Sequence, residues 1–160
     1  MKKWLLLLVA LPLLTACPPP YEFDTDYTPV YMKRSDLEQS VSFVAPRTLR
    51  NLGKIYLKGD TLYLGEKYEG IHVIDNSDPS NPRKLGFIVA PGCVDMAIKN
   101  NMLYADNAVD MVCIDLAQHK EVHRERNVFP ELVPPDGKEF QHPDKTSDMI
   151  VVRWKLSPSK

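Results

Sequence analysis

Two histidines four residues apart are the first pair whose spacing could bind a metal ion. On a helix, His119 and His123 would lie on one face and could share a zinc ion. Residues 120–126, however, have the composition of a strand, on which residues four apart lie about 13 Å from each other. We therefore expect no metal site here. His72 stands alone in an apolar segment, and we interpret it as a packed histidine rather than a catalytic base.

Acidic residues in the second half of the chain offer oxygen ligands but no recognisable metal-binding spacing. The tightest cluster joins Asp106 and Asn107 to Asp110, with Asp95 and Asp115 nearby. Their spacing is not that of an EF-hand, and acids at hairpin ends usually face solvent, so calcium binding is not favoured. The sequence also lacks the motifs of serine hydrolases, nucleotide-binding loops and zinc proteases. We therefore expect no cofactor, and binding rather than catalysis.

Aromatic side chains beside predicted hairpins are the stronger functional lead. Loops on rigid scaffolds commonly carry recognition, and residues 66–69 form a charged loop that is matched by residues 106–109. The residues expected to face a ligand are Tyr63, Glu66, Tyr68, Tyr104, Asp106 and Asp110. The alternative is that the tyrosines, including Tyr56, only pack at sheet edges with hydrated hydroxyl groups.

These loops belong to a pattern that occurs twice. Residues 58–63 (KGDTLY) are matched by residues 99–104 (KNNMLY), and residues 70–75 (GIHVID) by residues 110–115 (DMVCID). An offset of about 40 residues is typical of stacked supersecondary units. Each copy predicts a hairpin whose turn, Gly-Asp or Asn-Asn, tolerates positive φ. The third strand of each copy is nearly all apolar, which predicts that both of its faces are covered.

A fourth strand completes each unit. Residues 83–91 resemble residues 42–46 upstream, and residues 121–128 supply the last such strand. Four antiparallel strands per unit of about 40 residues is the blade of a β-propeller. We therefore predict an all-β fold of two tandem four-stranded antiparallel propeller-like blades. Because propellers close with about four to eight blades, two units predict a partial propeller or a sandwich-like wedge.

The repeat resembles that of the LVIVD-repeat proteins, bacterial cell-surface and periplasmic propellers. The resemblance covers residues 54–91, with the strand Ile71-His72-Val73-Ile74-Asp75 and the turn Asn76-Ser77-Asp78-Pro79-Ser80-Asn81-Pro82. It is weaker over residues 93–128. Residues 31–37 through 106–110 are also similar to a group of Bacteroidetes-type lipoproteins that carry these repeats. The resemblance implies a propeller-like fold and an envelope location.

The N-terminus has the pattern of a signal peptide. Lys2 and Lys3 precede an apolar run of 11 residues, Trp4 to Leu14, which is too short to span about 30 Å of hydrocarbon. The following Leu14-Thr15-Ala16-Cys17 resembles the lipobox of bacterial lipoproteins, and that resemblance implies a lipidated Cys17. The alternative is an ordinary secretory signal. Because Pro18 replaces the aspartate that retains some lipoproteins in the inner membrane, we expect outer-membrane delivery, facing the periplasm or the cell surface.

The charge of the processed chain argues against nucleic acid as a partner. Removing Lys2 and Lys3 from 20 basic residues leaves 18 against 21 acidic ones, a net charge of −3. Such a balance provides no electrostatic attraction for nucleic acid. The expected partners are the membrane, through the lipid anchor, and either a protein or further copies of the chain. Cys93 and Cys113, separated by one strand, would be about 9 to 10 Å apart, so we expect two buried thiols.

The predicted organisation has five segments. A signal peptide covers residues 1–16, and the lipidated cysteine with an extended tether covers 17–40, in which Ser35 could cap one helical turn. Two β-repeat units cover 41–128, a proline-rich loop 129–147, and a C-terminal strand and tail 148–160. We expect that strand to complete a sheet edge or to cap an open face. The expected function is a lipid-anchored binding or scaffolding module; the alternatives are an envelope-associated hydrolase and a self-associating structural lipoprotein.

Overall fold

The computed structural model describes residues 25–142 and 145–157, which form eleven strands and one four-residue helix. The expected all-β class is therefore confirmed. The elements, in chain order, are β1 (Tyr27–Lys33), α1 (Arg34–Leu37), β2 (Ser42–Val44), β3 (Leu52–Lys58), β4 (Thr61–Glu66), β5 (Gly70–Asp75), β6 (Arg83–Val89), β7 (Met96–Lys99), β8 (Met102–Asn107), β9 (Asp110–Asp115), β10 (Lys120–Glu125) and β11 (Met149–Leu156). Among the described residues, no helix has the length and apolar character needed to cross a membrane.

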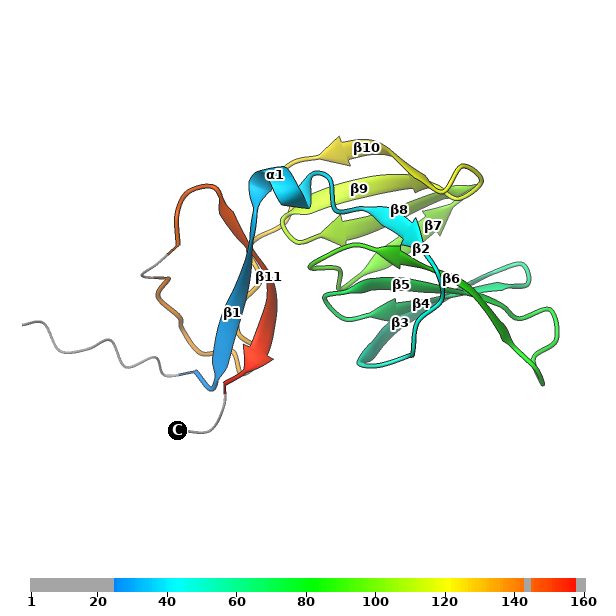
Figure 1. Cartoon of the computed structure of the whole chain (residues 1–160), viewed down its shortest axis with the longest axis horizontal. Helices are drawn as coiled ribbons and strands as arrows, with labels where there is room; N and C mark the ends of the chain where they lie inside the picture. Colours follow the sequence, from blue (N-terminus) through cyan, green and yellow to red (C-terminus); the bar gives the residue numbers. More distant parts are fainter. Residues whose placement is uncertain (1–24, 143–144, 158–160) are drawn as a thin grey trace, which may run out of the picture.

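The described strands form three antiparallel sheets, none of which closes on itself (Figure 1). We call the sheet ordered β2–β6–β5–β4–β3 sheet 1 and the sheet ordered β10–β9–β8–β7 sheet 2. Their central hairpins share one register, since Tyr63 lies opposite Val73 in sheet 1 and Tyr104 lies opposite Cys113 in sheet 2. The repeated strands therefore occupy equivalent positions in the two sheets.

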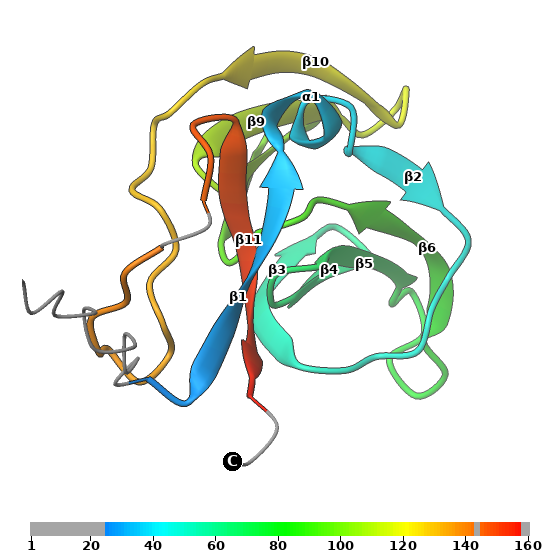
Figure 2. The ribbon, with the colours of Figure 1, turned by 60° about the vertical axis from the view of Figure 1, so that its left-hand side comes forward.

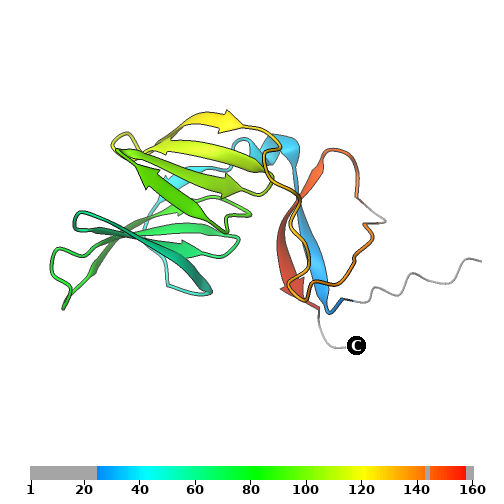
Figure 3. The same ribbon diagram turned by 180° about the vertical axis from the view of Figure 1, so that it is seen from behind.

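Sheets 1 and 2 pack face to face, and their contact contains most of the hydrophobic core (Figure 3). We call the two contacting faces the inner faces and the opposite ones the outer faces. Sheet 1 contributes Tyr63, Ile71, Val73 and Ile88, and sheet 2 contributes Met96, Ile98, Leu103, Ala105, Val112 and Ile114. At the edges of the two sheets, the hydroxyl of Tyr56 on β3 donates a 2.8 Å hydrogen bond to the carbonyl of Ile98 on β7.

The two apolar third strands differ in how they are covered. Both faces of β5 are buried, as expected. Sheet 2 covers the inner face. Residues 45–51 connect β2 and β3, which lie at opposite edges of sheet 1, and so cross the outer face. There Arg47 stacks on Phe87, with its guanidinium carbon 3.9 Å from the ring centre. On β9 the outward-facing Met111 and Cys113 are only half-buried. The expectation of cover on both faces is therefore wrong for β9.

The hairpin turns have the backbone conformation that the sequence predicts. Gly59 and Asn100, at equivalent positions of the two first turns, both have a φ of 55°. The second hairpin of sheet 1 needs a glycine for a different reason. At Gly70, φ is 142° and a Cβ would lie 2.0 Å from the carbonyl oxygen of Ile88. No larger residue fits this close approach of β5 to β6.

The third sheet corrects two expectations about the ends of the chain. Residues 27–33, expected within the tether, form β1, which pairs with β11 along its whole length. We call this pair the ribbon; it lies beside sheets 1 and 2 (Figure 2). Of the two roles expected for the C-terminal strand, β11 therefore does not complete an edge of a repeat sheet. Its partner lies near the other end of the sequence, so no local pattern could predict the pairing. Helix α1 begins after Lys33, and Ser35 does not cap it.

The ribbon is held to the repeats by a second hydrophobic cluster and by polar contacts. Leu37, Ala108, Val109, Ile150 and Val152 form the cluster, which joins α1 and β11 to the β8–β9 turn. Residues 129–142 and 145–147, the described part of the expected proline-rich loop, contain no strand or helix. Residues 1–24, with Cys17, lie outside the described residues, as do residues 143–144 and 158–160.

The packing of the inner faces predicts the cost of truncating a core leucine. Leu103 is fully buried between the two sheets, whereas Leu85 is 50% exposed. Leu103→Ala should lower the free energy of unfolding by about 2–5 kcal/mol, through lost burial and a residual cavity. Leu85→Ala is the matched control and should change it by about 0.5 kcal/mol or less. Urea denaturation followed by circular dichroism measures both, and equal losses would contradict the packing described here.

Candidate functional site

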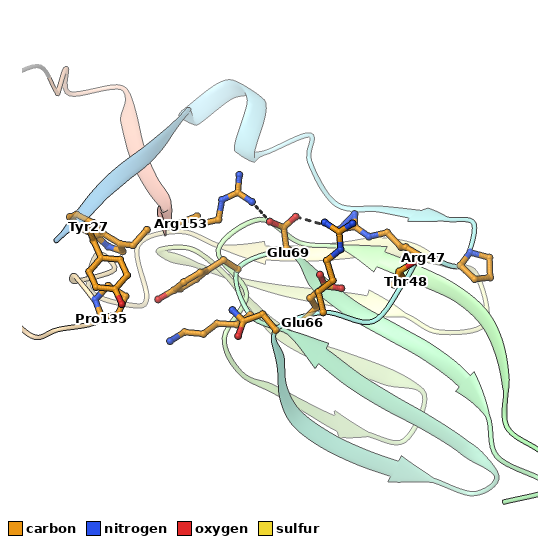
Figure 4. Close-up of a pocket in the computed structure, with 13 residues that line it drawn as sticks. Tyr27, Arg47, Thr48, Glu66, Glu69, Pro135 and Arg153 are labelled. Atoms are coloured by element: carbon orange, nitrogen blue, oxygen red, sulfur yellow. Dashed lines mark hydrogen bonds and ion pairs between the residues drawn. The ribbon is translucent and has the colours of Figure 1, made fainter. Parts of the chain in front are cut away.

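A polar cavity lies where the β4–β5 hairpin of sheet 1 approaches the ribbon (Figure 4). It has a volume of about 930 Å³. Three parts of the chain that are distant in sequence form its walls: the crossing segment 45–51, the hairpin residues 66–69, and the ribbon with its neighbouring loop. The first two parts belong to sheet 1, whereas the third depends on the pairing of β1 with β11.

The β4–β5 hairpin is fixed by backbone hydrogen bonds to the connection between the two sheets. The N–H of Tyr68 donates to the carbonyl of Cys93 at 2.6 Å, and the N–H of Gly92 donates to the carbonyl of Tyr68 at 2.9 Å. Tyr68 has a φ of 69°, so its backbone is held in the left-handed region, which is uncommon for a residue with a side chain. The hairpin is therefore a rigid wall of the cavity.

Glu69 lies between two arginines from separate parts of the chain. Its carboxylate pairs with Arg153 of β11 and lies 3.4 Å from a guanidinium nitrogen of Arg47 (Figure 4). The carboxylate of Glu69 thus connects the hairpin to both the ribbon and the crossing segment. Because Arg47 also stacks on Phe87, its guanidinium is oriented by two contacts.

A second carboxylate at the cavity is held by a side chain of its own sheet. Oε2 of Glu66 lies 2.6 Å from Nε2 of His72, within hydrogen-bond distance. Both side chains are buried, and His72 also makes an edge-to-face contact with Phe87, with 4.7 Å between ring centres. His72 is thus packed, as expected. Its Nδ1 has no hydrogen-bond partner among the described residues.

The cavity carries more positive than negative charge. Arg47, Arg50, Lys67 and Arg153 line it against two carboxylates, Glu66 and Glu69, both already paired. Within the described part of the chain, no ion pair is formed by Arg50 or Lys67, while Lys67 lies 4.9 Å above the ring of Tyr68. Three aromatic rings also line the cavity: Tyr27, Tyr68 and Trp154. Charge and aromatic surface together suit an anionic ligand with a ring or chain that can pack against the aromatic faces.

The residues predicted to face one ligand are separated by the structure. Glu66 and Tyr68 line the large cavity. Tyr63 faces the core between the sheets and is 6% exposed, so it does not face a ligand. Tyr104, although equivalent in register, lies on the outer face of sheet 2. Strand register determines on which face of its sheet a side chain lies. It does not determine whether another part of the chain covers that face.

Tyr104 and Asp106 line a smaller, mainly apolar cavity of about 340 Å³ on sheet 2. Burial raises the pKa of Asp106, although hydrogen bonds from the N–H groups of Asp95 and Val94 oppose the change. A hydrogen bond with Lys54 lowers the pKa of Asp95, which lines the same cavity. Two carboxyl groups in one cavity are thus shifted in opposite directions.

Asp110 is not a ligand-facing residue but the centre of a buried ionic network. Both of its oxygens lie 2.7 Å from Arg34, and Arg124 donates to it at 2.9 Å. Its side chain is fully buried and also accepts the N–H of Asn127 at 3.0 Å. Arg124 continues the network to Glu121. The expected ligand role of Asp110 is therefore wrong: its charge holds the start of α1 to sheet 2 and links β9 to β10 within that sheet.

The remaining candidates have structural surroundings. His119 lies in the β9–β10 turn and stacks on Phe43 with 4.0 Å between ring centres, whereas His123 is exposed on β10. No group of three or more potential metal ligands is found among the described residues. Cys93 and Cys113 are both free thiols, and burial raises the pKa of the Cys93 thiol. Cys113 is only half-buried, in contrast to the expectation.

Sequence reasoning missed most of the cavity. Arg47, Arg50, Arg153 and Trp154 were not candidates because they lie outside the repeated pattern. The charged loop at residues 66–69 was the one usable signal. No protein-family model, curated protein or solved structure matches the chain.

The ionic network predicts how stability depends on pH. Burial would raise the pKa of Asp110, but hydrogen bonds from Arg34, Asn127 and Arg124 outweigh it and lower the pKa. A carboxylate whose pKa is lowered on folding contributes stability above its unfolded pKa of about 3.9, and that contribution disappears as the pH falls through the folded value. Asp110→Asn should lower the free energy of unfolding by about 3 kcal/mol at pH 7, because two cations lose their anionic partner.

Denaturation measured between pH 7 and pH 2 tests this account. The difference in free energy of unfolding between the wild type and Asp110→Asn should become smaller as the pH falls below about 4. Asp36→Asn, at an exposed aspartate of α1, is the matched control and should have little effect at any pH. A loss from Asp110→Asn that is the same at all pH values would contradict the role of its charge.

Proposed function

We propose that the chain is a non-catalytic binding module that holds a small anionic ligand in the cavity between the β4–β5 hairpin and the ribbon. One observation carries the proposal: four cationic side chains and three aromatic rings line this cavity, while its two carboxylates are already paired. An anion entering the cavity would meet Arg50 and Lys67, whose charges are not balanced by any described carboxylate. Charge-assisted hydrogen bonds from such groups are the strong ones.

The repeat supports a propeller-like arrangement as the scaffold of this module. Sheets 1 and 2 pack through equivalent strands, with the edge strands β3 and β7 in contact and the shared register described above. Adjacent blades of a propeller are related in the same way. In this proposal the two sheets are two blades, and the ribbon is an addition that closes one side of the ligand cavity.

The N-terminal sequence supports an address for the module. A basic start, an apolar run of 11 residues and the sequence Leu-Thr-Ala-Cys ending at Cys17 fit a lipoprotein signal. The proposed protein is thus anchored in the outer membrane through lipids on Cys17, with the domain in the periplasm or at the cell surface. More than one acyl chain gives stable anchoring.

Ligand binding is tested by titrating the protein with glucuronate and glucose 6-phosphate, and with glucose as the neutral match, in a calorimeter. We expect the two anions to bind, more weakly as salt is added, and glucose not to bind. Replacing both Arg50 and Lys67 by glutamine should weaken binding by roughly tenfold or more, since two charge-assisted contacts are lost.

The matched control replaces two exposed lysines outside the cavity, Lys120 and Lys155, by glutamine and so removes the same charge. It should leave binding unchanged. Equal weakening by both double variants would show that only net charge matters, which would contradict a defined site. Absence of binding by either anion would remove the anionic ligand from the proposal.

A hydrolase is a second candidate because Asp95 and Asp106 share one cavity with pKa values shifted in opposite directions. Enzymes that use two carboxyl groups need one protonated and the other ionised. Against this role, both oxygens of Asp106 accept backbone N–H groups, an arrangement that favours the ionised carboxylate. Release of sugars from envelope glycans that Asp106→Asn abolishes would favour the hydrolase over binding.

The anchor is tested at the lipidated residue. Cys17→Ser should abolish incorporation of labelled fatty acid and release the protein from membranes, because serine offers no thiol for the thioether bond. Cys113→Ser removes a half-buried thiol instead and should leave labelling intact. Persistent labelling of the Cys17→Ser variant would show that the lipobox interpretation is wrong.

A further inference from the structure

We propose that the chain assembles head to tail with copies of itself, the outer face of sheet 2 in one copy packing on the outer face of sheet 1 in the next. The central hairpins of the two sheets share one register. Ile55 lies opposite Leu64 in sheet 1, and Met96 lies opposite Ala105 in sheet 2, so these pairs are equivalent. The same register makes Leu57 equivalent to Ile98.

The contact inside the chain uses one kind of face from each sheet. Sheet 1 packs through the side that carries Tyr63, and sheet 2 packs through the side opposite to Tyr104. Because Tyr63 and Tyr104 are equivalent, each sheet shows its neighbour a different side. When two sheets contact each other through different sides, a further sheet can add at either end by the same contact. If they used the same side, two sheets would complete the contact and no further sheet could add.

Both sides that a further copy would use carry exposed apolar surface. On the outer face of sheet 1, Ile55 is 63% exposed and Leu57 is 59% exposed, although their equivalents Met96 and Ile98 are buried in the core. On the outer face of sheet 2, Tyr104, Met111 and Cys113 are half-buried and line or adjoin an apolar cavity. The crossing segment 45–51 covers sheet 1 near the β4–β5 hairpin, so the free contact area lies at the other end.

Charge complementarity identifies a second copy as the occupant. Inside the chain, Nζ of Lys58 donates to Oδ1 of Asn101 at 3.0 Å, which links the two first turns. The equivalents of these residues are Lys99 and Asp60, since Lys58 pairs with Thr61 just as Lys99 pairs with Met102. In a head-to-tail contact Lys99 of one copy therefore meets Asp60 of the next. Both are exposed, and neither has an ion pair among the described residues.

A second charge pattern agrees with the first. Lys54 and Asp95 occupy equivalent positions, directly before Ile55 and Met96, and they form an ion pair of 2.5 Å across the contact of β3 with β7. In a head-to-tail assembly these positions would alternate in sign from sheet to sheet. A propeller of four to eight blades would then close with about two to four copies.

The assembly is tested by charge reversal in the full chain, solubilised in detergent and measured by analytical ultracentrifugation. The wild-type protein should associate reversibly. Asp60→Lys and Lys99→Asp should each weaken association by roughly tenfold or more, because each variant brings like charges together. An equimolar mixture of the two variants should associate again, since every contact in an alternating assembly then joins opposite charges.

Glu139→Lys and Lys155→Asp are the matched controls, because they make the same charge changes at exposed residues outside both faces. They should associate as the wild type does, and circular dichroism should show all variants folded. A wild type that remains monomeric at every concentration would overturn the proposal. So would variants that behave like their controls, or a mixture that fails to restore association.

Discussion

The structure depends on the apolar contact between the inner faces of sheets 1 and 2. A four- or five-stranded sheet of this size cannot bury both of its faces by itself, and Ile71, Leu103 and Val112 are fully buried only because another sheet covers them. The Tyr56 hydroxyl, donating to the carbonyl of Ile98, fixes the sheets relative to each other at the edge strands. The hairpins, turns and loops that carry charge are attached to the ends of this packed pair.

The candidate site follows from that arrangement. The connection between the sheets accepts and donates the hydrogen bonds that hold Tyr68, so the β4–β5 hairpin is rigid. The buried Asp110 network holds the start of α1, and with it the ribbon, against sheet 2. Glu69 then joins hairpin, ribbon and crossing segment through Arg47 and Arg153. Arg50 and Lys67, which form no ion pair among the described residues, give the cavity its excess of positive charge.

The local pattern of the sequence predicted the repeated strands and their turns, because alternation and positive φ at Gly59 and Asn100 depend on neighbouring residues. It could not predict the ribbon, whose two strands lie at opposite ends of the chain. Nor could it predict that Tyr63 is buried while Tyr104 is half-exposed, since equivalent positions differ only in what covers them. Asp110 was misassigned because its arginine partners come from distant segments.

The two repeats thus share a register but differ in which faces are covered. Because each sheet is buried by the other, we expect both sheets to form one cooperative unit. Native-state hydrogen exchange of backbone amides measures this most directly. If the inner faces stabilise each other, the amides of β5 and β9 should exchange with the same free energy, equal to that of global unfolding. Exchange of β9 at a much lower free energy, while β5 stays protected, would contradict the account, because sheet 1 would then be stable without sheet 2.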